Sequence, residues 1–257
     1  MRKILQAIYR IKLFKRVVPS LLKIYINLTK TTEIVIQNNK VFFNLNLMNP
    51  IDKEIYLKGD YEKEQIDFLL DEIEKRNIKN FIDIGAHMGF YSINISKKNI
   101  KTYSFEPYKK NFEQLKKNIE LNKVDNIDIY NLALSNEKKM IKMWVPDKNK
   151  TGGFSVYDKN DEERKKYDKK KIYEIEGKSD LGDTFIKLEN EKIAIKIDVE
   201  RHEKKVLEGI NKLLKKNKII IQIELFEERK KDIFKILNQY NYNYFKKIQK
   251  DYYFKNF

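Results

Sequence analysis

The pattern of apolar and polar residues predicts alternating strands and helices from residue 81 to the end of the chain. Short apolar runs indicate buried strands, and apolar residues spaced three and four apart indicate helices between them. We expect strands at 81–84, 101–105, 127–132, 140–145, 193–199 and 218–225, helices at 89–98, 109–122, 202–216 and 228–240, and a closing hairpin at 242–248 and 252–254. Repeated strand–helix units predict an α/β fold whose mostly parallel sheet carries helices on both faces.

The first part of the chain has a different pattern. Residues 4–28 are apolar at helical spacing, and Pro19 predicts a break or kink near Val18. Residues 33–47 alternate between apolar and polar around an Asn-Asn pair, which predicts a β-hairpin. A helix is expected at 61–76.

These patterns divide the chain into a basic helix-and-hairpin extension, residues 1–50, and a main domain, residues 51–257. Residues 147–171 interrupt the main domain with a Gly-Gly pair and a run of charged residues. We expect a flexible insertion here. It could be a solvated surface loop, or a lid over a site, and the sequence leaves both open.

The net charge of +16 is concentrated at the two ends of the chain. Residues 1–50 and 204–257 each carry a net charge of +8, whereas residues 51–203 carry 31 basic and 31 acidic residues. Because residues 51–203 carry no net charge, the sequence does not favour a basic groove that binds a nucleic-acid phosphate backbone. Nucleic acid is therefore not the expected partner. In residues 1–28 the basic residues fall between apolar ones, which is typical of a helix in peripheral contact with an anionic membrane. Packing on its own domain or on a partner subunit remains the alternative.

The chain contains no cysteine, which excludes disulfides, thiolate catalysis and cysteine-bound metals. Its N-terminus begins like a signal peptide, but four basic residues between 10 and 16 interrupt the apolar region and no small-residue cleavage site follows. No apolar run approaches the roughly 18 residues of a membrane-spanning helix. We therefore expect a cytoplasmic protein, with any membrane contact at the inner face.

Two acidic residues lie at the ends of consecutive predicted strands. Asp83 precedes Gly85 and Gly89, which permit a tight turn and close approach of a ligand to the backbone. The spacing differs from the dinucleotide pattern Gly-x-Gly-x-x-Gly, which occurs nowhere in the chain, so no pyrophosphate is expected. Glu106 lies 23 residues after Asp83, where a carboxylate can accept hydrogen bonds from both ribose hydroxyls. Either acid alone could cap a helix, but together they predict a site for an adenosine-type ligand.

Four segments resemble a known family. They are Phe81 to Ser92, Phe105-Glu106-Pro107, Asn131 to Leu134 and Lys196 to Glu203. In this order they are similar to the FkbM family of methyltransferases, over residues 52 to 225 approximately. The resemblance implies a Rossmann-like class I methyltransferase fold with a seven-stranded, mostly parallel sheet. It also implies S-adenosylmethionine as cofactor and methylation of a substrate oxygen, often in sugars of surface polysaccharides or natural products.

The resemblance further implies a set of cofactor-binding residues, with Leu132 and Ala133 along the adenine. They are Asp83, Gly85, Ala86, His87, Gly89, Glu106, Pro107, Leu132, Ala133 and Asp198. The chain departs from the family pattern at two positions: His87 stands where the family usually has Asn, and Arg201 where it usually has Gly.

The end of the fourth main strand carries the candidate catalytic residues. A hydroxyl acceptor benefits from a general base, and Glu200 or His202 is the expected base, with Asp198 towards the methionine end of the cofactor. Amino-methyltransferases of nucleic acids typically have Asn/Asp-Pro-Pro-aromatic here, so the sequence Asp198-Val199-Glu200 favours an oxygen acceptor. Glu203 and Glu224 add carboxylates, but their spacing indicates no metal site.

The expected substrate is therefore a hydroxyl-bearing small molecule or glycan. The alternative is a membrane- or nucleic-acid-associated methyltransferase, or a binding protein, with a non-glycan substrate.

Overall fold

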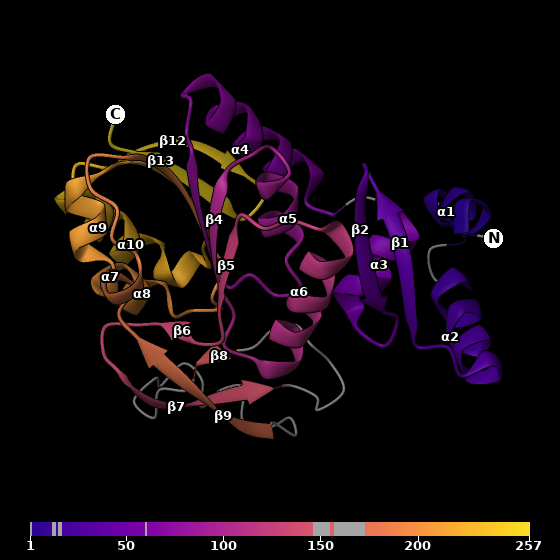
Figure 1. Ribbon diagram of the computed structural model, residues 1–257. Helices are drawn as coiled ribbons and strands as arrows, with labels where there is room; N and C mark the ends of the chain where they lie inside the picture. Colours follow the sequence, from indigo (N-terminus) through magenta and orange to yellow (C-terminus); the bar gives the residue numbers. More distant parts are fainter. Residues whose placement is uncertain (1, 12–13, 15–16, 60, 146–154, 157–172) are drawn as a thin grey trace.

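The computed structural model describes residues 2–11, 14, 17–59, 61–145, 155–156 and 173–257. Its centre is a seven-stranded sheet in the order β12-β13-β11-β10-β3-β4-β5 (Figure 1). The strands are β3 (Asn80–Ile84), β4 (Lys101–Phe105), β5 (Ile127–Tyr130), β10 (Lys192–Ile197), β11 (Lys218–Glu224), β12 (Asn243–Ile248) and β13 (Asp251–Lys255). Six of these strands point in the same direction, and β13 runs antiparallel to its two neighbours, β11 and β12. The predicted α/β fold with a mostly parallel seven-stranded sheet is confirmed.

Helices cover both faces of this sheet (Figure 1). On one face lie α4 (Lys63–Lys75), α5 (Phe90–Ser96) and α6 (Lys109–Asn122); on the other lie α7 (Gly182–Phe185), α8 (Glu203–Gly209), α9 (Asn211–Lys216) and α10 (Glu227–Gln239). Successive strand residues point to opposite faces. Phe81 and Ala194 therefore pack with the α4–α5 side, and isoleucines such as Ile82 and Ile195 pack with α8–α10.

Most predicted elements of the main domain are present, with changed ends. The helix expected at 202–216 is divided into α8 and α9 at Ile210, whose backbone leaves the helical region. Gly209 lies so close to Ser135 that an added Cβ would meet the Ser135 carbonyl oxygen at 1.9 Å. The strand expected to reach residue 199 ends at Ile197, so Asp198 is the first residue of the loop that follows.

A second, four-stranded sheet lies below the main one in Figure 1, in the order β6-β9-β7-β8. It contains β6 (Ala133–Leu134), β7 (Lys139–Val145), β8 (Ser155–Val156) and β9 (Tyr173–Asp180). The prediction of a strand at 140–145 is confirmed, whereas β9 was not predicted because its residues are mostly polar. Except for β8, the expected insertion at 147–171 lies outside the described residues.

The N-terminal region comprises α1 (Arg2–Arg10), α2 (Val17–Thr29), β1 (Glu33–Asn38), β2 (Val41–Asn46) and α3 (Pro50–Lys58). The hairpin is confirmed, with Asn39 and Lys40 at positive φ in its turn. Helix α3 was not predicted, although Pro50 begins it and Gly59, at φ +80°, ends it.

Both N-terminal helices pack against the rest of the chain. The break expected near Val18 lies earlier, since α2 already begins at Val17. Pro19 therefore falls in the first turn of α2, where its missing N–H is tolerated. Helix α1 lies against α3, and the side chains of Arg2 and Gln6 donate hydrogen bonds to the Tyr56 carbonyl at 3.3 and 3.0 Å. None of the helices in the described part of the chain is long and apolar enough to cross a membrane.

Candidate active site

The candidate site lies where the strand order reverses, between the neighbouring strands β3 and β10. Open parallel sheets bind ligands at such a switch point, beyond the carboxyl ends of the strands. Gly85, at φ +88°, follows β3, and an added Cβ would lie 1.9 Å from the carbonyl oxygen of Asp198. The amide of Asp198 in turn donates to the Ile84 carbonyl at 3.0 Å. Only glycine fits this contact, and Gly85 lines the pocket.

Asp83 is buried at the floor of the site. Its Oδ2 accepts hydrogen bonds from the amide and the hydroxyl of Ser92, at 3.1 and 2.5 Å. Its Oδ1 is also buried and accepts no hydrogen bond from the described part of the chain. Burial raises the pKa of Asp83, and the nearby ammonium of Lys196 opposes this rise. An unused carboxylate oxygen lining a pocket suits a cationic group of a ligand.

Glu106, at the end of β4, is also buried. Its Oε2 accepts the amide of His87 and its Oε1 the amide of Tyr108, both at 2.8 Å. Burial raises the pKa of Glu106 to about 7, although these hydrogen bonds favour the charged form. The side-chain amide of Asn111 also donates to Oε1, at the long distance of 3.5 Å, and Oε2 can accept a second hydrogen bond. The carboxyl group is thus held rigidly and can still accept a hydrogen bond from a ligand hydroxyl.

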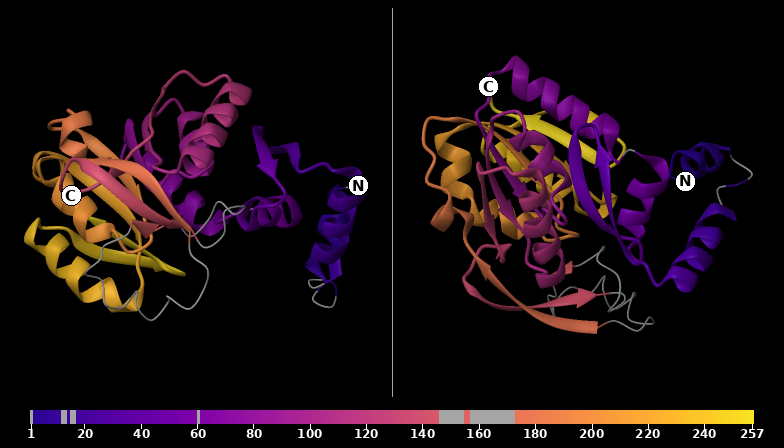
Figure 2. Two further views of the ribbon diagram at one scale, coloured as in Figure 1. Left: turned by 90° about the horizontal axis from the view of Figure 1, so that it is seen from below. Right: turned by 45° about the vertical axis from the view of Figure 1, so that its right-hand side comes forward.

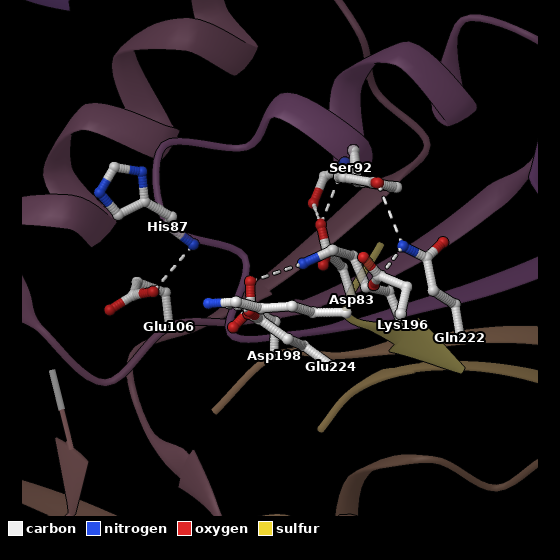
Figure 3. A network of polar contacts seen from close by, with 11 residues as sticks. Asp83, His87, Ser92, Glu106, Lys196, Asp198, Gln222 and Glu224 are labelled. Carbon is white, nitrogen blue, oxygen red and sulfur yellow. Dashed lines mark hydrogen bonds and ion pairs between the residues drawn. The ribbon is translucent and has the colours of Figure 1, made fainter. Parts of the chain in front are cut away.

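A row of polar side chains crosses the sheet at the same level. Lys196 on β10 pairs in register with Asp83 on β3 and with Gln222 on β11. Its Nζ lies 3.0 Å from Oδ2 of Asp198 and 4.8 Å from the centre of the Tyr91 ring (Figure 3). Burial alone would lower the pKa of Lys196, but the surrounding carboxylates, Asp198 foremost, raise it.

The sequence carried a signal for this row that the prediction did not use. In each of three buried strands a single polar residue stands between two isoleucines, and these residues are Asp83, Lys196 and Gln222. A polar side chain in a fully buried strand requires a partner, so three of them at matching positions indicate a network across the sheet.

Asp198 and Glu224 form a second pair of acids beside this row (Figure 3). Burial would raise the pKa of Asp198, but Lys196 and a hydrogen bond from Glu224 lower it. Burial and the charge of Asp198 raise the pKa of Glu224 to about 8. Near neutral pH the two acids therefore hold one proton, on Glu224, while Asp198 is ionised.

The two residues predicted as general base follow Asp198. Glu200 and His202 both line the pocket. His202 is buried, and its Nε2 lies 3.0 Å from the hydroxyl oxygen of Ser135. Glu200 is half-buried and adopts φ +49°. The carboxylate is therefore the more accessible of the two groups.

Arg201 turns away from the pocket. Its guanidinium bonds Oε1 of Glu228 at 2.9 Å and stacks 4.0 Å over the Phe226 ring. Its φ of +78° explains why the family usually has glycine here, and His87, at φ +50°, occupies another position that favours Asn. Both departures from the family pattern thus keep the backbone conformation of the site.

The pocket brings together nearly all of the predicted cofactor-binding residues. Those that line it are Asp83, Gly85, Ala86, His87, Glu106, Pro107, Leu132, Ala133 and Asp198. Gly89 does not line it. It lies at the N-terminus of α5 with φ +88°, where an added Cβ would meet the Leu115 side chain at 2.4 Å. Ile51 and Ile55 of α3 and the buried Lys196 also line the pocket, and sequence reasoning did not include them. Within the described residues, no group of three or more His, Asp or Glu side chains is arranged to hold a metal ion.

A family model described as the methyltransferase FkbM domain matches residues 83–244. The chain belongs to the FkbM family of methyltransferases. Among curated proteins none matches the chain. The solved structures it resembles include TYW2 of M. jannaschii in complex with AdoMet, at 13% identity over 88% of this chain and 84% of that chain, with a TM-score of 0.41. Another is magnesium protoporphyrin IX methyltransferase of Synechocystis PCC 6803 with bound SAM, at 12% identity over 80% and 83%, with a TM-score of 0.45.

The FkbM-family protein is an S-adenosylmethionine-dependent methyltransferase, and its pocket fits this cofactor. The buried Oδ1 of Asp83 can accept a hydrogen bond, Gly85 lines the pocket with its backbone alone, and Glu106 lines the pocket with a fixed carboxyl group. These three features match an ammonium group, a close backbone approach and the ribose hydroxyls, respectively.

Proposed function

We propose that this methyltransferase acts on a hydroxyl oxygen of a sugar, a glycan or a glycosylated metabolite. The observation that carries the proposal is the pair Glu200 and His202, which line the pocket immediately after Asp198. A hydroxyl must lose its proton as it is methylated, and a carboxylate or imidazole within hydrogen-bond reach can accept that proton. The resemblance to a family that often methylates sugars supports the acceptor class.

The chain's own residues divide into a binding group and a reacting group. When bound, the cofactor supplies a methyl group on a positively charged sulfur. Asp83 would hold the ammonium end through Oδ1, Glu106 would accept the ribose hydroxyls, and Leu132 and Ala133 would lie along the adenine. Asp198 stays ionised beside Lys196 and would add negative charge at the methionine end of the cofactor. The main task of these groups is to position the reactants.

Glu200 is the better candidate for the base. The Nε2 of His202 already contacts the Ser135 hydroxyl inside the protein, whereas Glu200 is half-buried at the pocket wall. We therefore assign proton acceptance to Glu200 and positioning of the segment to His202. No metal ion is required by this assignment.

Binding of S-adenosylmethionine to the purified protein, measured by calorimetry, tests the cofactor site. Asp83→Asn and Glu106→Gln each remove a charge at constant size and should weaken binding by about 10- to 100-fold, as expected for loss of a charge-assisted hydrogen bond. Asp128→Asn is the matched control, because Asp128 is a more exposed acid on β5 that pairs with Lys101 outside the pocket. No binding by the wild-type protein would refute the function.

The acceptor is tested by supplying the enzyme and cofactor carrying a labelled methyl group to a cell extract. We expect label in the glycan or glycolipid fraction, and we expect it to survive mild alkali, because methyl ethers resist hydrolysis whereas methyl esters do not. Label confined to RNA or protein would contradict a glycan or glycosylated metabolite as the acceptor, and label released by alkali would contradict an ether product. Both results would leave the methyltransferase assignment intact.

A further inference from the structure

Helix α2 is apolar on two opposite faces. One face is buried in the core of the protein, and its residues are Val18, Leu22 and Ile26. The other face is open, and its residues are Val17, Leu21, Ile24 and Leu28, spaced as one stripe of a helix. Leu21, Ile24 and Leu28 are 51%, 55% and 79% exposed. Since the inner face already fixes the helix to its domain, the outer stripe does not contribute to the fold.

The segment before α2 also carries exposed apolar side chains. Ile4 in α1 is 65% exposed, and Ile11 and Phe14 between the helices are exposed as well. Seven of the 13 large apolar side chains that are exposed in the described part of the chain fall within residues 4–28. Figure 2 shows α1 and α2 together at one end of the molecule, with α2 projecting from it. We call this surface, formed by Ile4, Ile11, Phe14, Val17, Leu21, Ile24 and Leu28, the N-terminal apolar face.

The segment that carries this face has charges of a single sign. Residues 1–32 contain eight basic residues and no acidic one, and Lys23 and Lys30 of the described residues are exposed. Two copies joined through this face would bring two such segments together, and like charges repel. A surface of anionic phosphates complements it, because each lysine or arginine near such a surface gains about 1 kcal/mol.

We propose that the N-terminal apolar face docks on the surface of an anionic phospholipid bilayer. The apolar stripe enters the boundary between headgroups and acyl chains, and the basic side chains meet the lipid phosphates. Neither helix crosses the bilayer. Helix α3 lies between α1 and the pocket, since it packs against α1 and contributes Ile51 and Ile55 to the pocket lining. Docking would thus hold the active site near the membrane, independently of which acceptor the enzyme methylates.

Flotation of the protein, residues 1–257, with vesicles tests this proposal. One set of vesicles contains phosphatidylcholine alone, and the other contains phosphatidylcholine and phosphatidylglycerol in equal parts. The wild-type protein should float with the anionic vesicles only, and less so at high salt. The variant Leu21→Gln/Ile24→Gln/Leu28→Gln should bind at least about tenfold more weakly. Burying even one such apolar side chain in the bilayer contributes a free energy of about the size that a tenfold change in affinity requires.

A matched control replaces exposed apolar residues elsewhere. Leu121→Gln/Met140→Gln changes side chains on α6 and β7 that are 40% and 61% exposed, and it should float like the wild type. Cofactor binding should be unchanged in both variants and the unfolding midpoint should shift equally little, because every substituted side chain is at least 40% exposed. Three results would overturn the proposal: no flotation of the wild type with anionic vesicles, equal flotation of the triple variant, or a wild-type dimer that the triple substitution dissociates.

Discussion

The buried ammonium of Lys196 allows a prediction about stability to be worked out in detail. Replacing it in Lys196→Met keeps the length and most of the volume of the side chain but removes its charge. Lys196 is 5% exposed, its Nζ lies 3.0 Å from Oδ2 of Asp198, and Asp83 and Asp251 are also near enough to affect its pKa. The substitution therefore leaves several buried carboxyl groups without their cation.

Removing one partner of a buried ion pair costs about 3–5 kcal/mol, because the remaining charge is left without compensation. The side chain of Asp198 is 26% exposed, so water relieves part of this cost and we expect about 3 kcal/mol near pH 8. The loss should decrease at lower pH. Without Lys196 the pKa of Asp198 in the folded protein rises above its value in the unfolded chain. Between these two pKa values, the bound proton stabilises the folded state by about 1.4 kcal/mol for each unit by which the pH is lowered.

Urea unfolding followed by circular dichroism at pH 5 and at pH 8 measures both quantities. The control is Lys192→Met, the same substitution four residues earlier on the same strand at an exposed position, which should change stability by no more than about 0.5 kcal/mol. The double variant Lys196→Met/Asp198→Asn should regain part of the loss, because it removes the uncompensated charge. The reasoning is refuted if Lys196→Met costs no more than the control, or costs the same at both pH values.

Three further predictions concern the pocket. Gly85→Ala should lower the free energy of unfolding by at least about 2 kcal/mol, measured with urea, because its Cβ would meet the Asp198 carbonyl at 1.9 Å and φ is +88°; unchanged stability would contradict this geometry. Glu200→Gln should reduce kcat by about 10²- to 10⁴-fold while cofactor affinity stays the same, and wild-type turnover would exclude Glu200 as the base. Without added cofactor, the melting temperature should fall as the pH is raised from about 5 to about 8, because folded Glu106 and Glu224, with pKa values of about 7 and about 8, keep protons that the unfolded chain releases near pH 4.5. A melting temperature that rises over this interval would show that these carboxyls are not protonated in the fold.

The main sheet and its helices could be predicted from periodicity because their residues are buried on defined faces. The strands at 81–84 and 218–225 are nearly continuous apolar runs, and such runs are typical of parallel strands buried on both sides. Strand β9 could not be predicted in this way. Its residues are mostly polar, and β9 is a strand because it pairs with β7 along its length, a partner far away in the sequence.

The site could be predicted in part, because some of its residues follow from local rules and others from pairing between strands. Asp83 and Glu106 each end a strand, and Gly85 marks a turn, so a single stretch of sequence indicates them. The role of Lys196 depends on its register with Asp83, which only the order of strands determines. Helix α3 adds Ile51 and Ile55 from an element of nine residues in which apolar and charged residues are too mixed to show a clear helical period.

Because β3 and β10 are neighbours in the sheet, their pairing also affects how the protein folds during its synthesis. Asn80 pairs with Ile193, about 110 residues later, so the pocket floor joins segments that leave the ribosome at different times. A nascent chain that ends before β10 already contains Asp83 and Glu106, but it lacks Asp198, and the edge of β3 that β10 will cover is open to wrong pairing. Only the complete sheet contains the whole pocket, so the cofactor can stabilise the finished fold but cannot assist its first half.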